Sequence, residues 1–249
     1  MTGEDSLALI IRRYPALSCC EKEIWEASMA SIDCYENSRK ILVCGNGGSC
    51  ADADHIVGEL MKSFEKRRPV EKDLEDGLKS VSNERGEYIA KNLQSALPAI
   101  SLNAHSSLIS AISNDIDPNL IFAQQVAGYG REGDLLIAIS TSGNSQNIVD
   151  AVITAKAKGL TVIGLTGQSG GEMKQYCDIP ICVPAVNTAE VQELHLPVYH
   201  TICKAVENRF FNTRAKQSAF TTCRISNSVP GQAGKSNPEP RWKMASRPE

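Results

Sequence analysis

A regular alternation between short apolar runs and helical stretches constrains the fold of this chain most. The apolar runs, rich in β-branched residues, lie at 41–44, 99–102, 135–140, 161–166 and 179–183. Stretches with helical periodicity lie at 21–36, 51–64, 119–129, 147–158 and 188–211. Strands that alternate with helices favour βαβ crossovers, and strands that are apolar throughout are typical of a parallel sheet with both faces covered. The sequence therefore predicts an α/β protein: a three-layer α/β/α sandwich, flavodoxin-like or Rossmann-like, around a five-stranded parallel sheet.

A charged segment at 65–94 interrupts this alternation between the first crossover helix and the second strand. Within it, apolar residues recur at spacings that could line one face of an added helix or pair of helices. These residues are Leu74, Leu78, Val81, Tyr88 and Ile89. We expect an insertion that packs on the rim of the sheet, within a single domain that has N-terminal helices and spans residues 1–211.

The C-terminal segment, residues 212–249, differs in composition from the rest of the chain. It holds seven Lys and Arg against two acidic residues, a net charge of +5, with four prolines and no sustained apolar period. Such a composition favours a basic, disordered tail. The tail is interpreted either as a solvated segment without a chemical role or as a weak electrostatic tether to an acidic partner.

Composition excludes several classes of protein. No apolar run approaches the ~20 residues that a membrane span needs, and the N-terminus lacks a basic region of the signal-peptide type. The nine cysteines show no CxxC spacing, which suits free thiols in a reducing compartment. A formal net charge of −3 gives no general case for nucleic-acid binding. We therefore expect a cytoplasmic protein with neither a membrane nor a nucleic acid as partner.

Two polar loops follow predicted strands and open predicted helices, which is where open α/β sheets bind ligands. Backbone amides and hydroxyls at a helix N-terminus can hold an anion, and neither loop contains Lys or Arg, which suits a phosphate monoester. The candidate phosphate-binding residues are Asn46, Gly47, Gly48 and Ser49 in the first loop, and Ser140, Thr141, Ser142 and Ser145 in the second. Either loop alone could be a plain strand-to-helix turn. Neither matches a dinucleotide fingerprint or a P-loop, so no nucleotide cofactor is expected.

Four sequence blocks resemble the sugar isomerase (SIS) domain family and, within it, the phosphoheptose isomerases. They are CGNGGSCADADHIVGEL at 44–60, ISND at 112–115, GREGDLLIAISTSGNS at 130–145 and VQELHLPVYH at 191–200. The resemblance runs from the first predicted helix to about residue 211, apart from 65–94. It implies a phosphosugar site and an aldose–ketose isomerase that converts sedoheptulose 7-phosphate to D-glycero-D-manno-heptose 7-phosphate through an enediol.

The resemblance also implies roles for individual side chains. Glu59 corresponds to the base that abstracts the proton and His200 to its partner acid/base, while His55 and Gln192 complete the polar pocket. His55 and Glu59 are four residues apart, and Gln192 and His200 eight apart, so each pair shares a helix face. Asn114 and Asp115 correspond to a pair that lines the sugar cleft.

A divalent metal is a further expectation. His55, Glu59, Gln192 and His200 form a plausible ligand set for Zn²⁺, although a Gln carbonyl is an unusual zinc ligand. An isolated His on an amphipathic helix is more often a packed or surface residue. His195, turned roughly 140° from His200 around the same helix, is expected to face a neighbouring helix or a subunit interface.

Two alternatives to a heptose isomerase stay open. One is a non-catalytic SIS module that binds phosphosugars or a protein partner, like the replication-initiator-associated and transcriptional-regulator relatives. The other is an isomerase of a different sugar phosphate. The presence of both Glu59 and His200 favours an enzyme.

The family resemblance implies a homotetramer with active sites shared between subunits. Apolar stripes on two predicted helices suggest surfaces that a single chain leaves uncovered, or else helices that pack on each other. The stripes are Ile24, Trp25, Met29 and Ile32 on one helix, and Leu194, Val198 and Ile202 on the other.

Overall fold

The computed structural model describes residues 3–211, and side chains from residue 6 onward. The first compact unit of the chain is Met1–Asn212. The predicted basic tail at 212–249 lies outside the described residues.

The five predicted strands form one parallel sheet, which confirms the predicted fold class. They are β1 (Ile41–Gly45), β2 (Ala99–Ser101), β3 (Leu135–Ile139), β4 (Thr161–Thr166) and β5 (Ile179–Cys182). Their order is β2-β1-β3-β4-β5, and every neighbouring pair is parallel. The chain moves outward in opposite directions from β1 and β3, so the loops after these two strands flank the topological switch point, where such sheets bind ligands.

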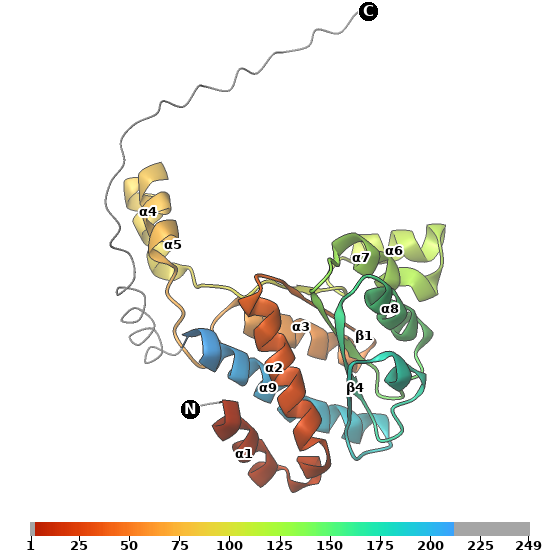
Figure 1. The fold of residues 1–249 in the computed structure, drawn as a ribbon. Helices are drawn as coiled ribbons and strands as arrows, with labels where there is room; N and C mark the ends of the chain where they lie inside the picture. The colour runs from red at the N-terminus through yellow and green to blue at the C-terminus, as the bar shows by residue number, and fades with distance from the viewer. Residues whose placement is uncertain (1–2, 212–249) are drawn as a thin grey trace, which may run out of the picture. The chain divides into compact units, whose positions relative to one another are not determined.

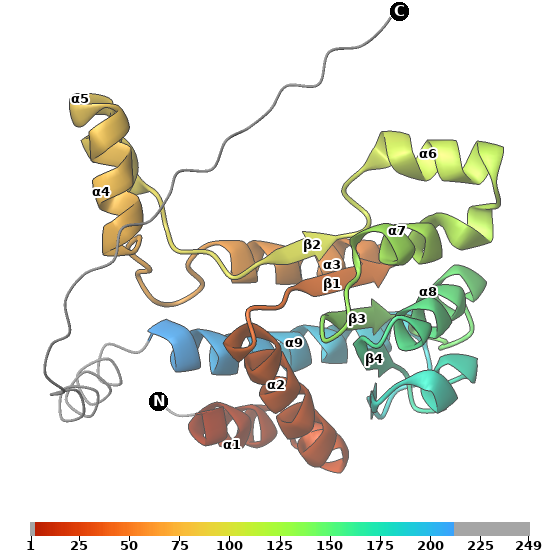
Figure 2. The same ribbon diagram turned by 45° about the horizontal axis from the view of Figure 1, so that its top comes forward.

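Helices cover both faces of the sheet (Figures 1 and 2), and alternate residues of each strand enter two separate cores. Val43 and Ile137 pack with helices α1 (Gly3–Arg13), α2 (Glu21–Glu36), α3 (Gly48–Met61) and α9 (Thr188–Phe211). Leu42 and Leu136 pack with α7 (Ile121–Tyr129) and α8 (Gln146–Ala157). Burial on both faces explains why the strands are apolar throughout.

Helices α3 and α9 lie side by side and run in the same direction. Three contacts follow in order along both: Gln192 against Gly48, Tyr199 with Asp52, and Glu207 with the backbone of Phe64 just beyond α3. A Cβ at Gly48 would lie 2.3 Å from the Gln192 amide nitrogen, so the Gln192 side chain would have to move to accommodate it. The parallel pair brings side chains from opposite ends of the sequence onto one surface.

The segment 65–94 contains two helices, α4 (Lys72–Val81) and α5 (Asn83–Asn92), as the sequence indicated. The expectation that they pack on the rim of the sheet is wrong. They form a hairpin that projects from the sheet (Figures 1 and 2), and α4 has no buried residue. The two helices pack on each other, with Gly86 so close to the Leu78 carbonyl that a Cβ would lie 2.1 Å from its oxygen. The chain leaves and re-enters at a bridge between Pro69 and Gln94, and among the described helices and strands α4 packs mainly against α5.

The sequence analysis gave no residue range for α1 or for the helix α6 (Ser106–Asp115). The predicted helix at 119–129 begins with a separate 3₁₀ turn, Pro118–Leu120, before α7. Most of the apolar stripes on 21–36 and 188–211 are covered within the chain, because α2 packs against α9. Ile24 and Val198 are fully buried, and Met29 remains exposed. In the part of the chain that the structure describes, no helix has the length and apolar character needed to cross a membrane.

Candidate active site

The two candidate phosphate loops lie at the carboxyl ends of the neighbouring strands β1 and β3, and their side chains are joined. The side-chain amides of Asn46 and Asn147 donate to each other's oxygens, at 2.8 and 3.0 Å. The helix after each loop begins without a side-chain cap: α3 at Gly47, with φ of +56°, and α8 at Ser145. Uncapped N-terminal amides are donors that an anion can satisfy.

The serine loop is held in shape by its own hydroxyls. The backbone N–H of Gly143 donates to Ser140 Oγ at 3.2 Å, and Ser140 Oγ lies 3.2 Å from Ser145 Oγ. The Asn144 N–H donates to Ser142 Oγ, which is exposed. Gly143 has φ of +69°, and a Cβ there would lie 2.0 Å from the Gly170 carbonyl oxygen, so the turn needs glycine. The loop is compact and presents hydroxyl groups at its surface.

The predicted acid/base residues come together on α3 and α9. His55 Nε2 lies 3.3 Å from Glu59 Oε1 and 3.4 Å from His200 Nε2. Glu59 Oε2 accepts from Lys62 Nζ at 3.4 Å, and the Glu59 residue is only 9% exposed. A carboxylate and two imidazoles at the surface of two packed helices form a candidate centre for proton transfer.

Two residues that sequence reasoning missed orient this cluster. The Tyr199 hydroxyl donates to Asp52 Oδ1 at 3.2 Å and lies 3.0 Å from His55 Nδ1. Since its one proton goes to a carboxylate, the tyrosine oxygen accepts from His55 Nδ1–H. The Nε2 of a neutral His55 then carries a lone pair that faces Glu59 and His200. Because acceptors converge there, the place suits a shared proton or a cation.

Burial tunes the groups around this centre. It lowers the pKa of His200 below the ordinary histidine value, and protonation of His55 would lower it further. Burial raises the pKa of Asp52, although the hydrogen bond from Tyr199 opposes that shift. Burial also raises the pKa of the Tyr199 hydroxyl, so it remains a proton donor at neutral pH. His200 is therefore a neutral imidazole under ordinary conditions.

The other predicted site residues lie apart from the cluster. Gln192 reaches the N-terminal end of α3 at Gly48, and no contact joins it to His55, Glu59 or His200 in the described residues. Asn114 and Asp115 are exposed at the end of α6, where the Asn114 amide donates to Asp115 at 2.7 Å, and they line a separate open hollow. Across residues 3–211, no three His, Cys, Asp or Glu side chains are arranged to hold a metal ion together.

The two other histidines of the described residues, and two cysteines near the first loop, have structural places. His195 does not face a neighbouring helix or a subunit interface as expected: it is fully buried near the Thr166 backbone of β4, and burial lowers its pKa to about 4. His105 caps α6, its Nδ1 accepting from the Leu108 N–H at 3.3 Å. Cys44 is buried, and burial raises the thiol pKa of both Cys44 and Cys50, which makes them poor nucleophiles.

Comparisons with known proteins agree with this geometry. The SIS domain family matches residues 16–99 and 81–167. The phosphoheptose isomerase of Clostridium acetobutylicum is 40% identical over 186 residues, 75% of this chain and 82% of the relative. The solved phosphoheptose isomerase of Francisella tularensis is 32% identical, with a TM-score of 0.65 over 84% of this chain and all of that one. The enzyme from Neisseria gonorrhoeae is 33% identical, with a TM-score of 0.62 over 80% and 94%.

A five-stranded parallel sheet of this order, with two candidate phosphate loops at its switch point and a candidate acid/base cluster on the helix that follows the first loop, fits the SIS class, which the family match shows. Identity near 40% over most of the chain narrows the class to one family, because these curated relatives are all named phosphoheptose isomerase. The chain belongs to the phosphoheptose isomerase family of SIS domain proteins. Of the classes that the sequence left open, the enzyme is thereby confirmed and the non-catalytic binding module is set aside.

Proposed function

We propose that this chain interconverts sedoheptulose 7-phosphate and D-glycero-D-manno-heptose 7-phosphate by proton transfer through an enediol. The observation that carries the proposal is the cluster of Glu59, His55 and His200, within 3.3–3.4 Å contacts, on a helix pair that begins at the phosphate loop. The substrate itself is taken from the relatives, since phosphate loops and a base would also serve a shorter sugar phosphate.

In the proposed reaction, the Glu59 carboxylate removes the proton from C1 of the ketose. The electron pair forms the C1=C2 double bond of the enediol while the C2 oxygen takes up a proton. His200, neutral because burial lowers its pKa, accepts the proton of the O1 hydroxyl and returns a proton to O2. Glu59 then returns its proton to C2, which leaves the aldose with no net change in protons.

Substrate range is tested with a panel of C5, C6 and C7 ketose phosphates, with aldose formation followed by NMR. Turnover that is fastest on the C7 ketose supports the proposal, and preference for a shorter sugar would reassign the substrate. In a matched pair of variants, Ser142→Ala is expected to raise KM, because the hydroxyl binds phosphate in ground and transition states alike. Thr154→Ala, a control on the same helix α8 but away from the loop, should leave KM unchanged.

We propose further that the cluster takes Zn²⁺, with His55, Glu59 and His200 as its nearest ligands. Gln192, the fourth residue of the expected set, reaches Gly48 at the start of α3, so zinc binding requires a rearrangement of these side chains from the positions described. Support comes from His55 Nε2, whose lone pair faces a carboxylate oxygen and a second imidazole nitrogen. Bound zinc would polarise the oxygens of the two reacting carbons. The test is elemental analysis of the purified protein and of His55→Ala. About one zinc per chain, lost in the variant, is expected, and metal-free protein with full activity would contradict the assignment.

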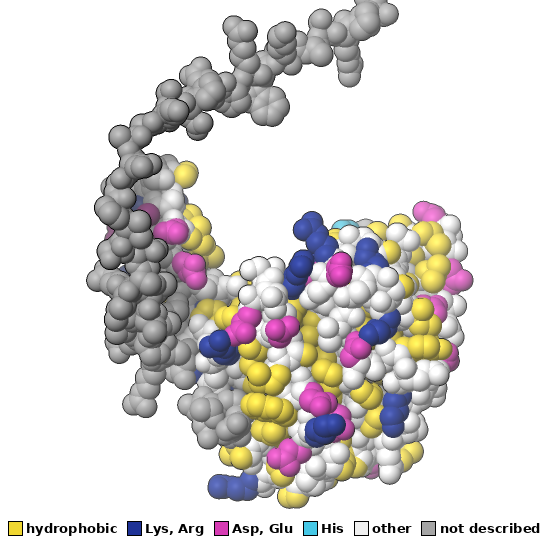
Figure 3. All heavy atoms as spheres, viewed as in Figure 1, with side chains coloured by type: hydrophobic (Ala, Val, Ile, Leu, Met, Phe, Trp, Pro, Cys, Tyr) yellow, Lys and Arg dark blue, Asp and Glu magenta, His cyan; other side chains and the backbone are white. Residues whose placement is uncertain are grey.

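The assembly that we propose is a homotetramer whose subunits share active sites. Its support is the set of large apolar side chains left exposed near the site: Met29 on α2, Met61 on α3 and Leu196 on α9, at 40–45% exposure. Figure 3 shows apolar side chains on the face where α2 lies. His200 also lines a hollow of about 230 Å³ between α1 and α9, which side chains of a neighbouring subunit would fill in such an assembly.

Light scattering on the eluting protein should give about four times the chain mass of 27.0 kDa. Leu196→Glu is expected to split the assembly and lower activity together. Val81→Glu, on the exposed hairpin, is the matched control and should leave the tetramer intact. A fully active monomer would contradict shared sites. We also propose a cytoplasmic location, supported by the eight free cysteines of the described residues.

A further inference from the structure

A buried ion pair joins the two catalytic helices, yet neither of its members belongs to the acid/base cluster. Arg68, in the segment after α3, and Glu207, near the end of α9, have side chains only 1% and 2% exposed. Arg68 Nη2 lies 2.8 Å and Nε 2.9 Å from Glu207 Oε1. Removing two charges from water costs several kcal/mol per ion, so a pair of this kind is weak evidence for stability alone. Its other hydrogen bonds show what it holds in place.

The remaining Arg68 donors bind the end of the helix that carries Glu59. Nη2 donates to the Glu59 carbonyl at 3.0 Å and Nη1 to the Leu60 carbonyl at 2.8 Å. These are among the last carbonyls of α3, which have no partner within the helix and carry the negative end of its dipole. The guanidinium therefore caps α3 at the very residue that supplies the proposed base.

Glu207 binds the backbone of the segment that lies against His200, the second proposed catalytic residue. Its two carboxylate oxygens accept the backbone N–H groups of Phe64 and Glu65, each at 2.9 Å. The Phe64 ring lies 5.2 Å from the His200 ring, and Glu65 pairs with Lys204 at 2.6 Å, one helical turn beyond His200. Burial would raise the pKa of Glu207, but the two N–H donors and Arg68 hold it below the ordinary value, so the carboxylate stays ionised.

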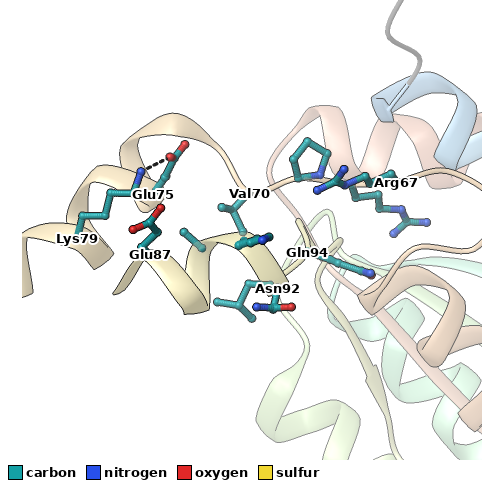
Figure 4. Close-up of a pocket in the computed structure, with 12 residues that line it drawn as sticks. Arg67, Val70, Glu75, Lys79, Glu87, Asn92 and Gln94 are labelled. Carbon is teal, nitrogen blue, oxygen red and sulfur yellow. Dashed lines mark hydrogen bonds and ion pairs between the residues drawn. The ribbon is translucent and has the colours of Figure 1, made fainter. Parts of the chain in front are cut away.

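Arg68 also stands where the α4–α5 hairpin joins the domain. Its own carbonyl accepts the Ser95 N–H at 2.8 Å, and the Ser95 hydroxyl donates to the Pro69 carbonyl. Figure 4 shows Arg67 and Gln94 at this neck and the Glu75–Lys79 pair farther out on the hairpin, around a hollow of about 320 Å³. Arg67 lies at the surface beside the hollow, whereas Arg68 points into the domain.

We infer that Arg68 and Glu207 are positioning residues of the isomerisation: together they fix the distance between Glu59 and His200. This role rests on the proposed function. Arg68 fixes the backbone at Glu59 through its hydrogen bonds to the helix carbonyls, and Glu207 fixes the position of the loop that lies against His200. A misplacement of about 1 Å between reacting groups can cost about 100-fold in rate, so the pair is expected to act on kcat.

The test compares single and double replacements of the pair. Arg68→Met or Glu207→Leu alone leaves a buried charge without its partner and is expected to destabilise the protein. The double variant removes both charges and keeps apolar volume, so it should fold. Its kcat should fall about 10-fold to 100-fold with KM changed by less than about twofold, because the phosphate loops lie at the opposite end of α3. Calorimetry with inorganic phosphate should give unchanged affinity.

A matched control separates positioning from stability. Asp134→Asn breaks another buried pair, Lys40 Nζ to Asp134 Oδ2 at 2.5 Å, at the amino end of β3. It should lower the melting temperature and leave kcat unchanged. Arg68→Lys keeps the charge but fewer donors, and its kcat should lie between those of the wild type and the double variant.

Three outcomes would overturn the inference: wild-type kcat in the folded double variant, an equal loss of kcat in Asp134→Asn, or a rise in KM that accounts for the whole loss. If the double variant does not fold, unchanged kcat in Arg68→Lys overturns it as well. A wild-type protein that converts no sugar phosphate would instead contradict the proposed function. The two failures are therefore distinguishable.

Discussion

The α3–α9 pair and the α4–α5 hairpin are both pairs of packed helices, but they differ in how many of their side chains are buried. Helix α9 buries half of its residues against α3, α2 and the sheet, including the polar side chains of His195 and Glu207. Helix α4 buries none, and its charges form exposed pairs such as Lys72 with Asp76. Exposed pairs of this kind contribute little to stability.

The difference shows where each region can carry function. On α3 and α9, a side chain is held by neighbours on several sides, so hydrogen-bond distances between catalytic groups are fixed by packing. On the hairpin, the only support is the partner helix. Chemistry that needs fixed geometry is therefore expected on the first pair and not on the second, and the following predictions test that contrast.

The largest expected effect is on catalysis. Glu59→Gln removes the proposed base while keeping its shape, so kcat should fall by about 10²–10⁴-fold with little change in melting temperature. The matched change on the hairpin, Glu75→Gln, should leave kcat unchanged. Steady-state kinetics with the C7 ketose phosphate measure both, and a loss below tenfold in Glu59→Gln would rule out its assigned role.

The next effect concerns the dependence of stability on pH. His195 is fully buried, so burial holds its pKa at about 4 in the folded protein, against 6.5 when unfolded, although the Thr166 backbone acts in the opposite direction. The unfolded state binds the extra proton first, so folding free energy is retained above pH 6.5 and lost as the pH falls towards 4. The loss amounts to about 3 kcal/mol.

Denaturant unfolding between pH 6.5 and 4 tests this. His195→Leu should flatten the dependence of the unfolding free energy on pH, whereas His105→Gln, at the exposed cap of α6, should preserve it. An unchanged slope in His195→Leu would mean that other groups cause the acid sensitivity.

The smallest expected effect is on the free energy of unfolding, tested by the same substitution at two positions. Val198→Ala on α9 removes a side chain that is 0% exposed and should cost about 2 kcal/mol of unfolding free energy. Val81→Ala on α4, where the side chain is 88% exposed, should change it by less than about 0.5 kcal/mol. Chemical denaturation measures both variants. Equal losses would show that the hairpin is packed against something in solution.

Much of the fold was predictable because its signals are local. Strand β4 begins and ends where the sequence indicates, and so do α2 and α9. The positions of the two polar loops after β1 and β3 were predictable too, since each directly follows an apolar run, and their binding of phosphate stays a prediction. Their amide link through Asn147 was not, because it depends on the adjacency of β1 and β3.

The rest depends on tertiary packing that no short pattern records. Tyr199 and Asp52 orient His55 only because α3 and α9 are parallel and in register. Arg67 and Arg68 are neighbours in one charged run, yet only Arg68 is buried, because Glu207 and two helix carbonyls meet it. The apolar positions of α4 match those of a helix packed on a sheet, so its exposure could not be inferred from them.

Because the two strands of chain at the base of the α4–α5 hairpin are joined by backbone contacts, the hairpin is also a place where the chain can be lengthened. Backbone contacts between Arg68 and Ser95, and between Pro69 and Gln94, bring the two ends of the insertion together before α4 begins. Added residues at Ser82, between α4 and α5, would leave the register of the sheet unchanged. Loop-closure entropy rises by only about 0.6 kcal/mol for each doubling of length. The hairpin is thus a natural position for grafting a reporter or an affinity domain into the enzyme.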